Sequence, residues 1–147
     1  MELNFNCFRK ILLYVEKYCV YEDTVNGRKM HEVSLYELCN ADELKEFDEE
    51  TKHYTVAKLF EGNYVEGKFV VNNYGKITTA RINSLTMKGH NMIDNISNEL
   101  IWNQAVELIN KNGKVSIDIL AKEVGQAAME FSKRTIGDSI INSVSKE

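Results

Sequence analysis

Two stretches of strand-forming residues, 64–71 and 77–85, most constrain how this chain can fold. They flank the polar pentapeptide Asn72-Asn73-Tyr74-Gly75-Lys76, whose glycine suits the turn of a β-hairpin. A hairpin at this point would close off the apolar faces of the helices that precede it. The predicted architecture therefore depends on this hairpin.

A helix is expected near the N-terminus. From Phe5 to Cys19, apolar residues recur at spacings of three and four, which places them on one helical face, and Asn4 is a candidate N-cap. Asn26-Gly27 indicates a turn. Residues 32–38 then alternate between polar and apolar, which predicts a short strand leading into a helical turn.

Two more helices are expected before the hairpin. The second is predicted over residues 41–47, and the third begins after Asp48, a candidate N-cap. Glu49 and Glu50 follow, where the helix dipole favours acidic side chains. Gly62-Asn63 should end this helix through a left-handed backbone conformation.

Helices are also expected after the hairpin. Thr86 is predicted to cap the first of them, with Gly89 allowing close approach to a neighbouring element. Asn98 and Ser116 are candidate caps for the next two. The single tryptophan, Trp102, fits either a core anchor or a contact with a partner protein.

The element order predicts an α+β fold. Three helices followed by a two-stranded hairpin match a winged helix-turn-helix-like core with a β-hairpin wing, and a generic small α+β domain also fits this order. We expect the core over residues 1–97. Residues 98–147 should form a helical extension that packs on the core or mediates oligomerisation.

Composition narrows the protein class. The 147 residues are 44% hydrophobic and 27% charged, as is usual for a soluble globular protein of one domain or of a small domain with an extension. There is no apolar run long enough for a membrane helix and no signal-peptide pattern at the N-terminus. Cys7, Cys19 and Cys39 form no C-x-x-C pair, which favours free thiols and a cytoplasmic location.

The charge is unevenly distributed along the chain. Residues 1–62 carry 8 basic and 13 acidic side chains, a charge of −5, whereas residues 63–147 carry 10 basic and 9 acidic ones, a charge of +1. A strongly basic nucleic-acid-binding protein would have a different balance.

Several blocks of the sequence resemble one protein family. The blocks are residues 1–16 (MELNFNCFRKILLYVE), 33–39 (VSLYELC), 85–96 (LTMKGHNMIDNI), 101–102 (IW) and 116–121 (SIDILA). Together they resemble a family of phages and Gram-positive bacteria catalogued as domain of unknown function 2513. The resemblance implies a winged-helix-like fold and a phage or prophage origin. It implies no biochemical activity and no functional residues, and Gly62-Asn63 departs from the alanine-glycine pair that is commoner in the family.

The third helix is one candidate DNA-contacting element. Its exposed face is expected to include Thr51, Lys52, Thr55 and Lys58, which could contact phosphates and one base. The N-terminal end of a recognition helix usually enters the major groove. Here that end carries Asp48, Glu49 and Glu50, which would repel phosphates.

The hairpin is the second candidate. Between residues 63 and 93 four basic side chains face only Glu66, a local charge of +3, and Tyr74 lies at the tip where an aromatic ring could pack on a sugar or a base. These charges could equally serve to keep an exposed sheet edge soluble. The candidate contacts on this element are Lys68, Tyr74, Lys76, Arg81 and Lys88.

No metal site, cofactor or catalytic centre is expected. His90 and Asp94 are four residues apart on a predicted helix, but two ligands are too few for a metal site, and no other His or Cys spacing completes one. His31 and His53 have no identifiable partner. No nucleophile with a base, phosphate-binding loop or G-x-S-x-G elbow is present, so we expect no enzyme.

The C-terminal helix has an apolar stripe that something must cover. The stripe would either pack on the same chain or form a homodimer. Ile136, Ile140, Ile141 and Val144 extend it, and residues 134–137 could interrupt it. The candidate interface residues are Ile117, Leu120, Val124, Ala128 and Phe131.

Two function classes remain open from the sequence. In the first, the protein is a phage-type regulatory factor that binds duplex DNA through backbone contacts. In the second, it is a protein-interaction module that acts on a host or phage protein. Binding to random duplex at low salt should separate the two.

Overall fold

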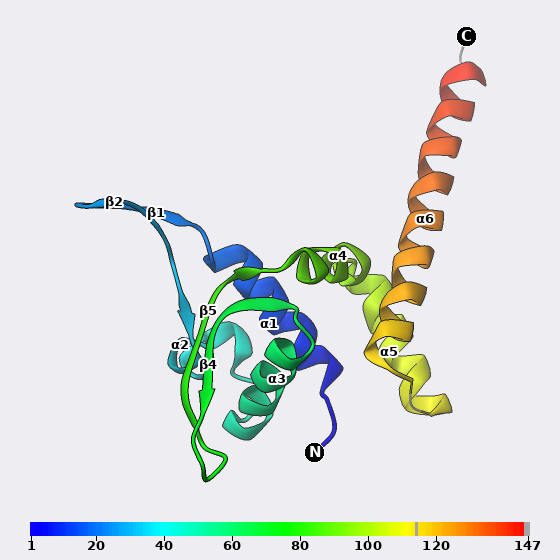
Figure 1. The fold of residues 1–147 in the computed structure, drawn as a ribbon. Coiled ribbons are helices and arrows are strands. Elements are labelled where there is room, and N and C mark those ends of the chain that lie inside the picture. The colour runs from blue at the N-terminus through cyan, green and yellow to red at the C-terminus, as the bar shows by residue number, and fades with distance from the viewer. Residues whose placement is uncertain (114, 146–147) are drawn as a thin grey trace. The chain divides into compact units, whose positions relative to one another are not determined.

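A computed structural model describes residues 1–113 and 115–145 and shows a mixed α+β chain (Figure 1). The chain divides into two compact units, Met1–Ile93 and Asp94–Glu147. The helices are α1 (Phe5–Tyr18), α2 (Leu35–Asn40), the 3₁₀ turn η1 (Asp42–Leu44), α3 (Glu49–Glu61), α4 (Met87–Ile96), α5 (Glu99–Asn112) and α6 (Ile117–Ser145). The strands are β1 (Tyr21–Thr24), β2 (Gly27–Met30), β3 (Val33–Ser34), β4 (Val65–Val71) and β5 (Ile77–Leu85).

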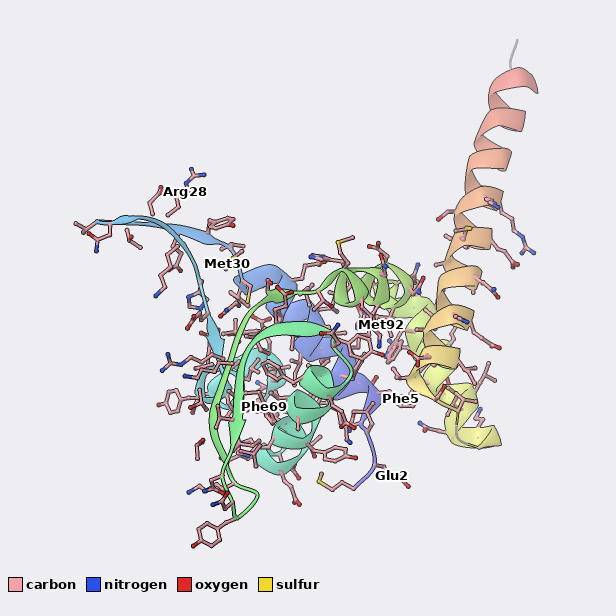
Figure 2. All side chains as sticks on the ribbon, viewed as in Figure 1. Glu2, Phe5, Arg28, Met30, Phe69 and Met92 are labelled. Carbon is pink, nitrogen blue, oxygen red and sulfur yellow. The ribbon has the colours of Figure 1, made fainter. Side chains whose placement is uncertain are left out.

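The predicted hairpin is confirmed. Strands β4 and β5 pair antiparallel, and β3 pairs with the other edge of β5, so the sheet order is β3-β5-β4. Its inner face packs on α1 and α3, where the rings of Phe60 and Phe69 stack at 5.1 Å. Figure 2 shows Phe69 on the side of the hairpin that faces α3. Core side chains come from all these elements and include Phe8, Ile11, Leu12, Val15, Val33, Leu38, Leu44, Val56, Leu59 and Ile82.

Three predicted helix ends are confirmed in the first unit. The Asn4 side chain accepts a hydrogen bond from the Cys7 backbone N–H, and the Asp48 side chain accepts one from that of Thr51. These caps satisfy backbone donors that the first helical turn leaves unpaired. At the end of α3 it is Asn63, with φ of 62°, that adopts the left-handed conformation.

The prediction of a helix over residues 41–47 is wrong. The helix lies earlier, as α2, and only Asp42–Leu44 follow as a 3₁₀ turn. Ser34 caps α2 by accepting a hydrogen bond from the Glu37 backbone N–H at 3.0 Å, which is the first half of a capping-box pattern. Ala41 then adopts an extended conformation, with ψ of 129°, so the helix cannot continue through it.

An exposed two-stranded ribbon, β1–β2, was not expected from the sequence. It joins α1 to β3 and extends away from them, with Arg28 labelled near its end (Figures 1 and 2). The predicted turn at Asn26-Gly27 lies between its strands, with Gly27 at φ of 113°. Its strands lack the polar–apolar alternation that marks a half-buried strand, because all but one of their residues are exposed.

The second unit is helical. Asn98 and Ser116 cap α5 and α6 as predicted, through hydrogen bonds from the Ile101 and Ile119 backbone N–H groups. α6 runs without a break through residues 134–137, where the sequence had left an interruption open. Trp102 is buried, as core packing requires. The side chains of Ile136, Ile140, Ile141 and Val144 lie outside the described part of the structure.

Two further expectations from the sequence concern the cysteines and membrane-spanning helices. Cys7, Cys19 and Cys39 are all free thiols. Within the described residues, no helix has the length and apolar character needed to cross a membrane.

Candidate nucleic-acid interface

The solvent face of the β4–β5 hairpin brings two positive charges together. Lys68 and Arg81 are direct partners in the antiparallel register and are both exposed. Their sequence neighbours Phe69 and Ala80 form the next pair and face the interior. Because side chains alternate between the faces of a strand, the two basic side chains lie side by side on the outer face. This pair is the centre of the candidate interface.

A β-bulge sets the register that creates this pair. The pairing shifts between Glu66 and Gly67, and Gly67 has φ of 155°. A Cβ atom at Gly67 would lie only 1.9 Å from the carbonyl oxygen of Arg81. Glycine is therefore required for the two backbones to approach here, which fixes Lys68 opposite Arg81.

Little negative charge balances the pair. The Arg81 guanidinium lies 3.9 Å from a Glu32 carboxylate oxygen, at the limit of an ion pair, and its side chain remains mostly exposed. Lys68 makes no hydrogen bond or ion pair with any described residue. Like charges directly opposite each other destabilise a sheet, so an anion at this position would relieve the repulsion.

The tip of the hairpin presents Tyr74 and Lys76. The Asn72 side-chain oxygen accepts hydrogen bonds from the backbone N–H groups of both residues, each at 2.9 Å. Gly75, at φ of 78°, completes the turn. The local geometry is thereby held by a side chain, while Tyr74 is 95% exposed and Lys76 is also exposed.

An open depression lies beside Arg81. It has a volume of about 220 Å³ and is lined by the start of α2 and by β5, including Ser34, Tyr36, Thr79 and Arg81. Tyr36 is 79% exposed, which is unusual for an aromatic ring. Sequence reasoning missed Tyr36, because its position next to β5 follows from the β3–β5 pairing.

Two of the predicted contacts on α3 are not available. Lys52 is 3% exposed and its ammonium donates a hydrogen bond to the Cys39 carbonyl at 3.2 Å. Thr55 is fully buried and its hydroxyl donates to the Thr51 carbonyl. The expectation that both lie on an exposed face is wrong, because α3 packs against α1 and α2 and so buries two sides of the helix.

The remaining predicted contacts on α3 are engaged locally. Thr51 hydrogen-bonds Asp48, which lowers the pKa of that carboxyl group. The Lys58 ammonium lies 2.6 Å from a Glu61 carboxylate oxygen. With the exposed Glu49 and Glu50, the start of α3 is an acidic surface that disfavours phosphate.

Lys88 is exposed but held in place. Its ammonium donates to the Gly62 carbonyl at 2.8 Å and lies 4.4 Å from the centre of the Tyr64 ring. These contacts give Lys88 a structural role at the junction of α3, β4 and α4. We therefore leave Lys88 out of the candidate interface.

The histidines have partners that the sequence did not reveal. His31 lies between Glu22 and Glu37, with nitrogen–oxygen distances of 3.4 and 3.0 Å. His53 lies 3.5 Å from Glu49 on the preceding turn of α3. His90 and Asp94, the pair considered from the sequence, are both exposed.

Three potential metal ligands lie together between α2 and α3. One ligand atom each of Cys39, Glu49 and His53 lies within 4.8 Å of the others. Sequence reasoning missed this group because the ligands come from two helices. The spacing of Glu49 and His53 by four residues was the one available signal.

The apolar stripe of α6 is partly used within the chain. Leu120 and Val124 are buried, so they cannot form a surface contact without opening the chain. Ile117 and Ala128 are half-buried, and Phe131 is exposed. Beside the stripe, α5 and α6 border an open depression of about 400 Å³, lined by Ala105, Leu108, Ile109, Val115, Ile119 and Leu120 among others.

Comparison with known proteins gives one match. A family model described as "hypothetical protein (DUF2513)" matches residues 2–115, which is most of the chain. No curated protein and no solved structure matches. The description of the family states no activity, so any function has to be argued from the geometry.

Proposed function

Because the chain belongs to the DUF2513 family, whose description names no activity, we propose its function from the β4–β5 hairpin: the first unit binds duplex DNA through this wing. Apart from the β1–β2 ribbon and the η1 turn, the element order is α1–β3–α2–α3–β4–β5. This order and the sheet order β3-β5-β4 support a winged-helix-like architecture for this unit. A regulatory role, and the phage or prophage origin that the family resemblance implies, are part of the same proposal.

The observation that carries the proposal is the Lys68–Arg81 pair. Two cationic side chains directly across a sheet repel each other, and the Glu32 carboxylate, 3.9 Å from the Arg81 guanidinium, offsets this only weakly. A phosphate group bound between them would contact both charges. Arg81 can also donate two parallel hydrogen bonds to phosphate oxygens, which a lysine cannot.

Three further side chains extend this surface. Lys76 at the tip adds a third cation, and Tyr74 and Tyr36 offer exposed rings that can pack on sugars. Such contacts fix the position of a protein on the duplex and carry little sequence information. We therefore propose binding with low sequence preference.

Helix α3 is excluded from the proposed surface. Its N-terminal turn carries Asp48, Glu49 and Glu50, and Lys52 is buried. Phosphates close to three carboxylates would be repelled. The proposed DNA-binding mode therefore differs from the conventional one, in which a recognition helix enters the major groove.

A titration of random duplex DNA, followed by fluorescence anisotropy at low salt, tests the proposal. The Lys68→Ala/Arg81→Ala variant should bind more weakly than the wild type. Its slope of log affinity against log salt should be shallower by about 1, since the one phosphate contact shared by the two side chains is lost and each such contact contributes roughly 0.9. The matched control is Lys29→Ala/Lys45→Ala, which removes the same charge at exposed positions outside the wing and should bind like the wild type.

Two outcomes would contradict the proposal. In one, the wild type fails to bind duplex at micromolar protein, which is the result expected of a protein-interaction module. In the other, both double variants lose the same affinity, so only net charge matters and the wing has no special part.

We propose further that two copies of the chain pair through the C-terminal helices. The support is the apolar depression between α5 and α6, where Leu108 and Ile119 are both exposed. Pairing would double the number of wings that contact one duplex. The proposed contact uses this surface and not the side chains of Leu120 and Val124, because those two are already buried within the chain.

Light scattering checks the pairing. The full chain should have the mass of a dimer, and Leu108→Glu/Ile119→Glu should have that of a monomer, because burying two carboxylates at an interface is unfavourable. Val20→Glu/Val25→Glu, at exposed positions of β1–β2 or next to it, should remain dimeric. A monomeric wild type would exclude the proposed pairing.

A further inference from the structure

The group formed by Cys39, Glu49 and His53 combines three different ligand types. Cys39 lies in α2, whereas Glu49 and His53 lie one turn apart on α3. The sulfur, a carboxylate oxygen and an imidazole nitrogen are all within 4.8 Å of one another. We propose that these three side chains bind a zinc ion that links α2 to α3.

The distances fit zinc with small side-chain movements. Zinc forms bonds of about 2.0–2.3 Å to nitrogen, oxygen and sulfur, so neighbouring ligand atoms in a tetrahedral site lie roughly 3.5 Å apart. The Glu49 oxygen and the His53 nitrogen are already 3.5 Å apart. The Cys39 sulfur has to approach by about 1 Å, which rotation of the side chains supplies.

The donor set selects zinc among the common cations. Magnesium and calcium prefer oxygen ligands, whereas a thiolate with an imidazole suits zinc. Three protein ligands leave a fourth position open for water or another ligand. His53 and Cys39 are only half-buried and Glu49 is exposed, so an ion can reach the group from solvent.

The surrounding charges both favour and oppose the ion. Asp48 and Glu50 flank Glu49 at the start of α3 and add negative charge. The Lys52 ammonium opposes a cation, but it is directed to the Cys39 carbonyl at 3.2 Å. The carboxylates of Asp48, Glu49 and Glu50 outnumber the Lys52 ammonium, so the site is attractive to a divalent cation.

Binding should also stabilise the fold. Cys39 precedes the η1 turn in the sequence and His53 follows it. One ion bound to both therefore restrains the α2–η1–α3 segment. An ion that binds the folded state more tightly than the unfolded chain raises the melting temperature with increasing ion concentration. This effect does not depend on DNA binding, so the two proposals can fail separately.

Cobalt(II) titration of the full-length protein is the test, with cobalt as a spectroscopic substitute for zinc. The wild type should show a sulfur-to-cobalt charge-transfer band and visible bands of a tetrahedral site, saturating at one ion per chain and lost on addition of zinc. Cys39→Ser should lose the charge-transfer band. His53→Asn should weaken binding by at least the ~10–100-fold that removal of an outer-shell partner costs.

Matched variants test whether a substitution acts through folding and whether other side chains bind the ion. Cys19→Ser and His90→Asn change the same residue types outside the group and should retain the wild-type bands. Glu49→Gln keeps the shape of an exposed side chain and should lower cobalt affinity without changing the melting temperature of the metal-free protein. Zinc should raise the melting temperature of the wild type and of both controls, and magnesium should not.

Three results would overturn the inference. The first is a wild type without a charge-transfer band at millimolar cobalt. The second is a band that survives in Cys39→Ser or disappears in Cys19→Ser. The third is equal cobalt affinity for Glu49→Gln, His53→Asn and the wild type.

Discussion

Replacing Gly89 with alanine is expected to destabilise the first unit by about 1–3 kcal/mol or more, the usual cost of overpacking. A Cβ atom at this position would lie 2.2 Å from the carbonyl oxygen of Tyr64 and 3.3 Å from the Leu85 Cβ. The first of these atoms belongs to the backbone, so it cannot rotate away. Helix α4 would have to move off the start of β4.

Hydrogen bonds fix α4 at this close approach. The Thr86 backbone N–H donates to the Tyr64 carbonyl at 3.1 Å, and the Thr86 hydroxyl donates to the Asn63 carbonyl at 2.7 Å. The Gly89 backbone N–H donates in turn to the Thr86 hydroxyl at 3.0 Å. A displaced α4 would therefore lose several hydrogen bonds as well as the packing at Gly89.

The expected loss of stability in Gly89→Ala is opposite in sign to the usual effect of this substitution in a helix. In an ordinary helix, glycine to alanine is stabilising by about 1 kcal/mol. Gly137 in α6 provides the matched control, because a Cβ atom there would meet nothing within 4 Å. Gly137→Ala should raise the free energy of unfolding, measured by urea titration with far-ultraviolet circular dichroism. A Gly89→Ala variant as stable as the wild type would show that α4 is not held against Tyr64.

The same contacts give a physical meaning to the sequence block at residues 85–96. This block is one of those that resemble the DUF2513 family, and the structure shows Thr86 as a helix cap and Gly89 as a contact point. Lys88 adds its hydrogen bond to the Gly62 carbonyl. These roles explain the residue types at positions 86, 88 and 89 without any reference to a ligand.

Local signals accounted for much of the fold. The caps at Asn4, Asp48 and Thr86 and the turn within the hairpin each depend on a few neighbouring residues, and each was predicted from the sequence. The error at residues 41–47 was also local, because Ser34 and Glu37 formed a capping pattern that was not weighed. The turn at Asn26-Gly27 was predicted, but the strands of the β1–β2 ribbon lack apolar alternation and were therefore missed.

The candidate site depended on information that is not local. Lys68 and Arg81 were each predicted as contacts, but their direct opposition follows from the bulge at Gly67. Cys39 and His53 meet because α2 packs on α3, which no spacing along the chain reveals. The faces of α3 were misjudged for the same reason, since the helix contacts two other helices.

For Lys52, the sequence and the structure predict opposite effects of replacement by alanine. An exposed DNA-contacting lysine could be replaced by alanine with little effect on stability and with a loss of DNA affinity. The structure instead buries the side chain, with its ammonium hydrogen-bonded to the Cys39 carbonyl. On this basis Lys52→Ala should affect stability first.

We expect Lys52→Ala to lower the free energy of unfolding by about 2–4 kcal/mol. Three buried methylene groups are lost, each worth about 0.8 kcal/mol, together with a hydrogen bond worth roughly 1 kcal/mol or more. Lys52→Met keeps the apolar stem and should recover most of the loss, because only the hydrogen bond is then missing. Urea unfolding of the two variants separates these contributions.

Lys58→Ala is the control on the same helix. Lys58 pairs with Glu61 at the surface, and surface ion pairs contribute little to stability, so its replacement should leave the unfolding curve nearly unchanged. Unfolding curves for Lys52→Ala and Lys58→Ala that coincide would show that Lys52 is exposed in solution. α3 would then present a basic side chain to DNA after all, and the wing would no longer be the sole candidate surface of the first unit.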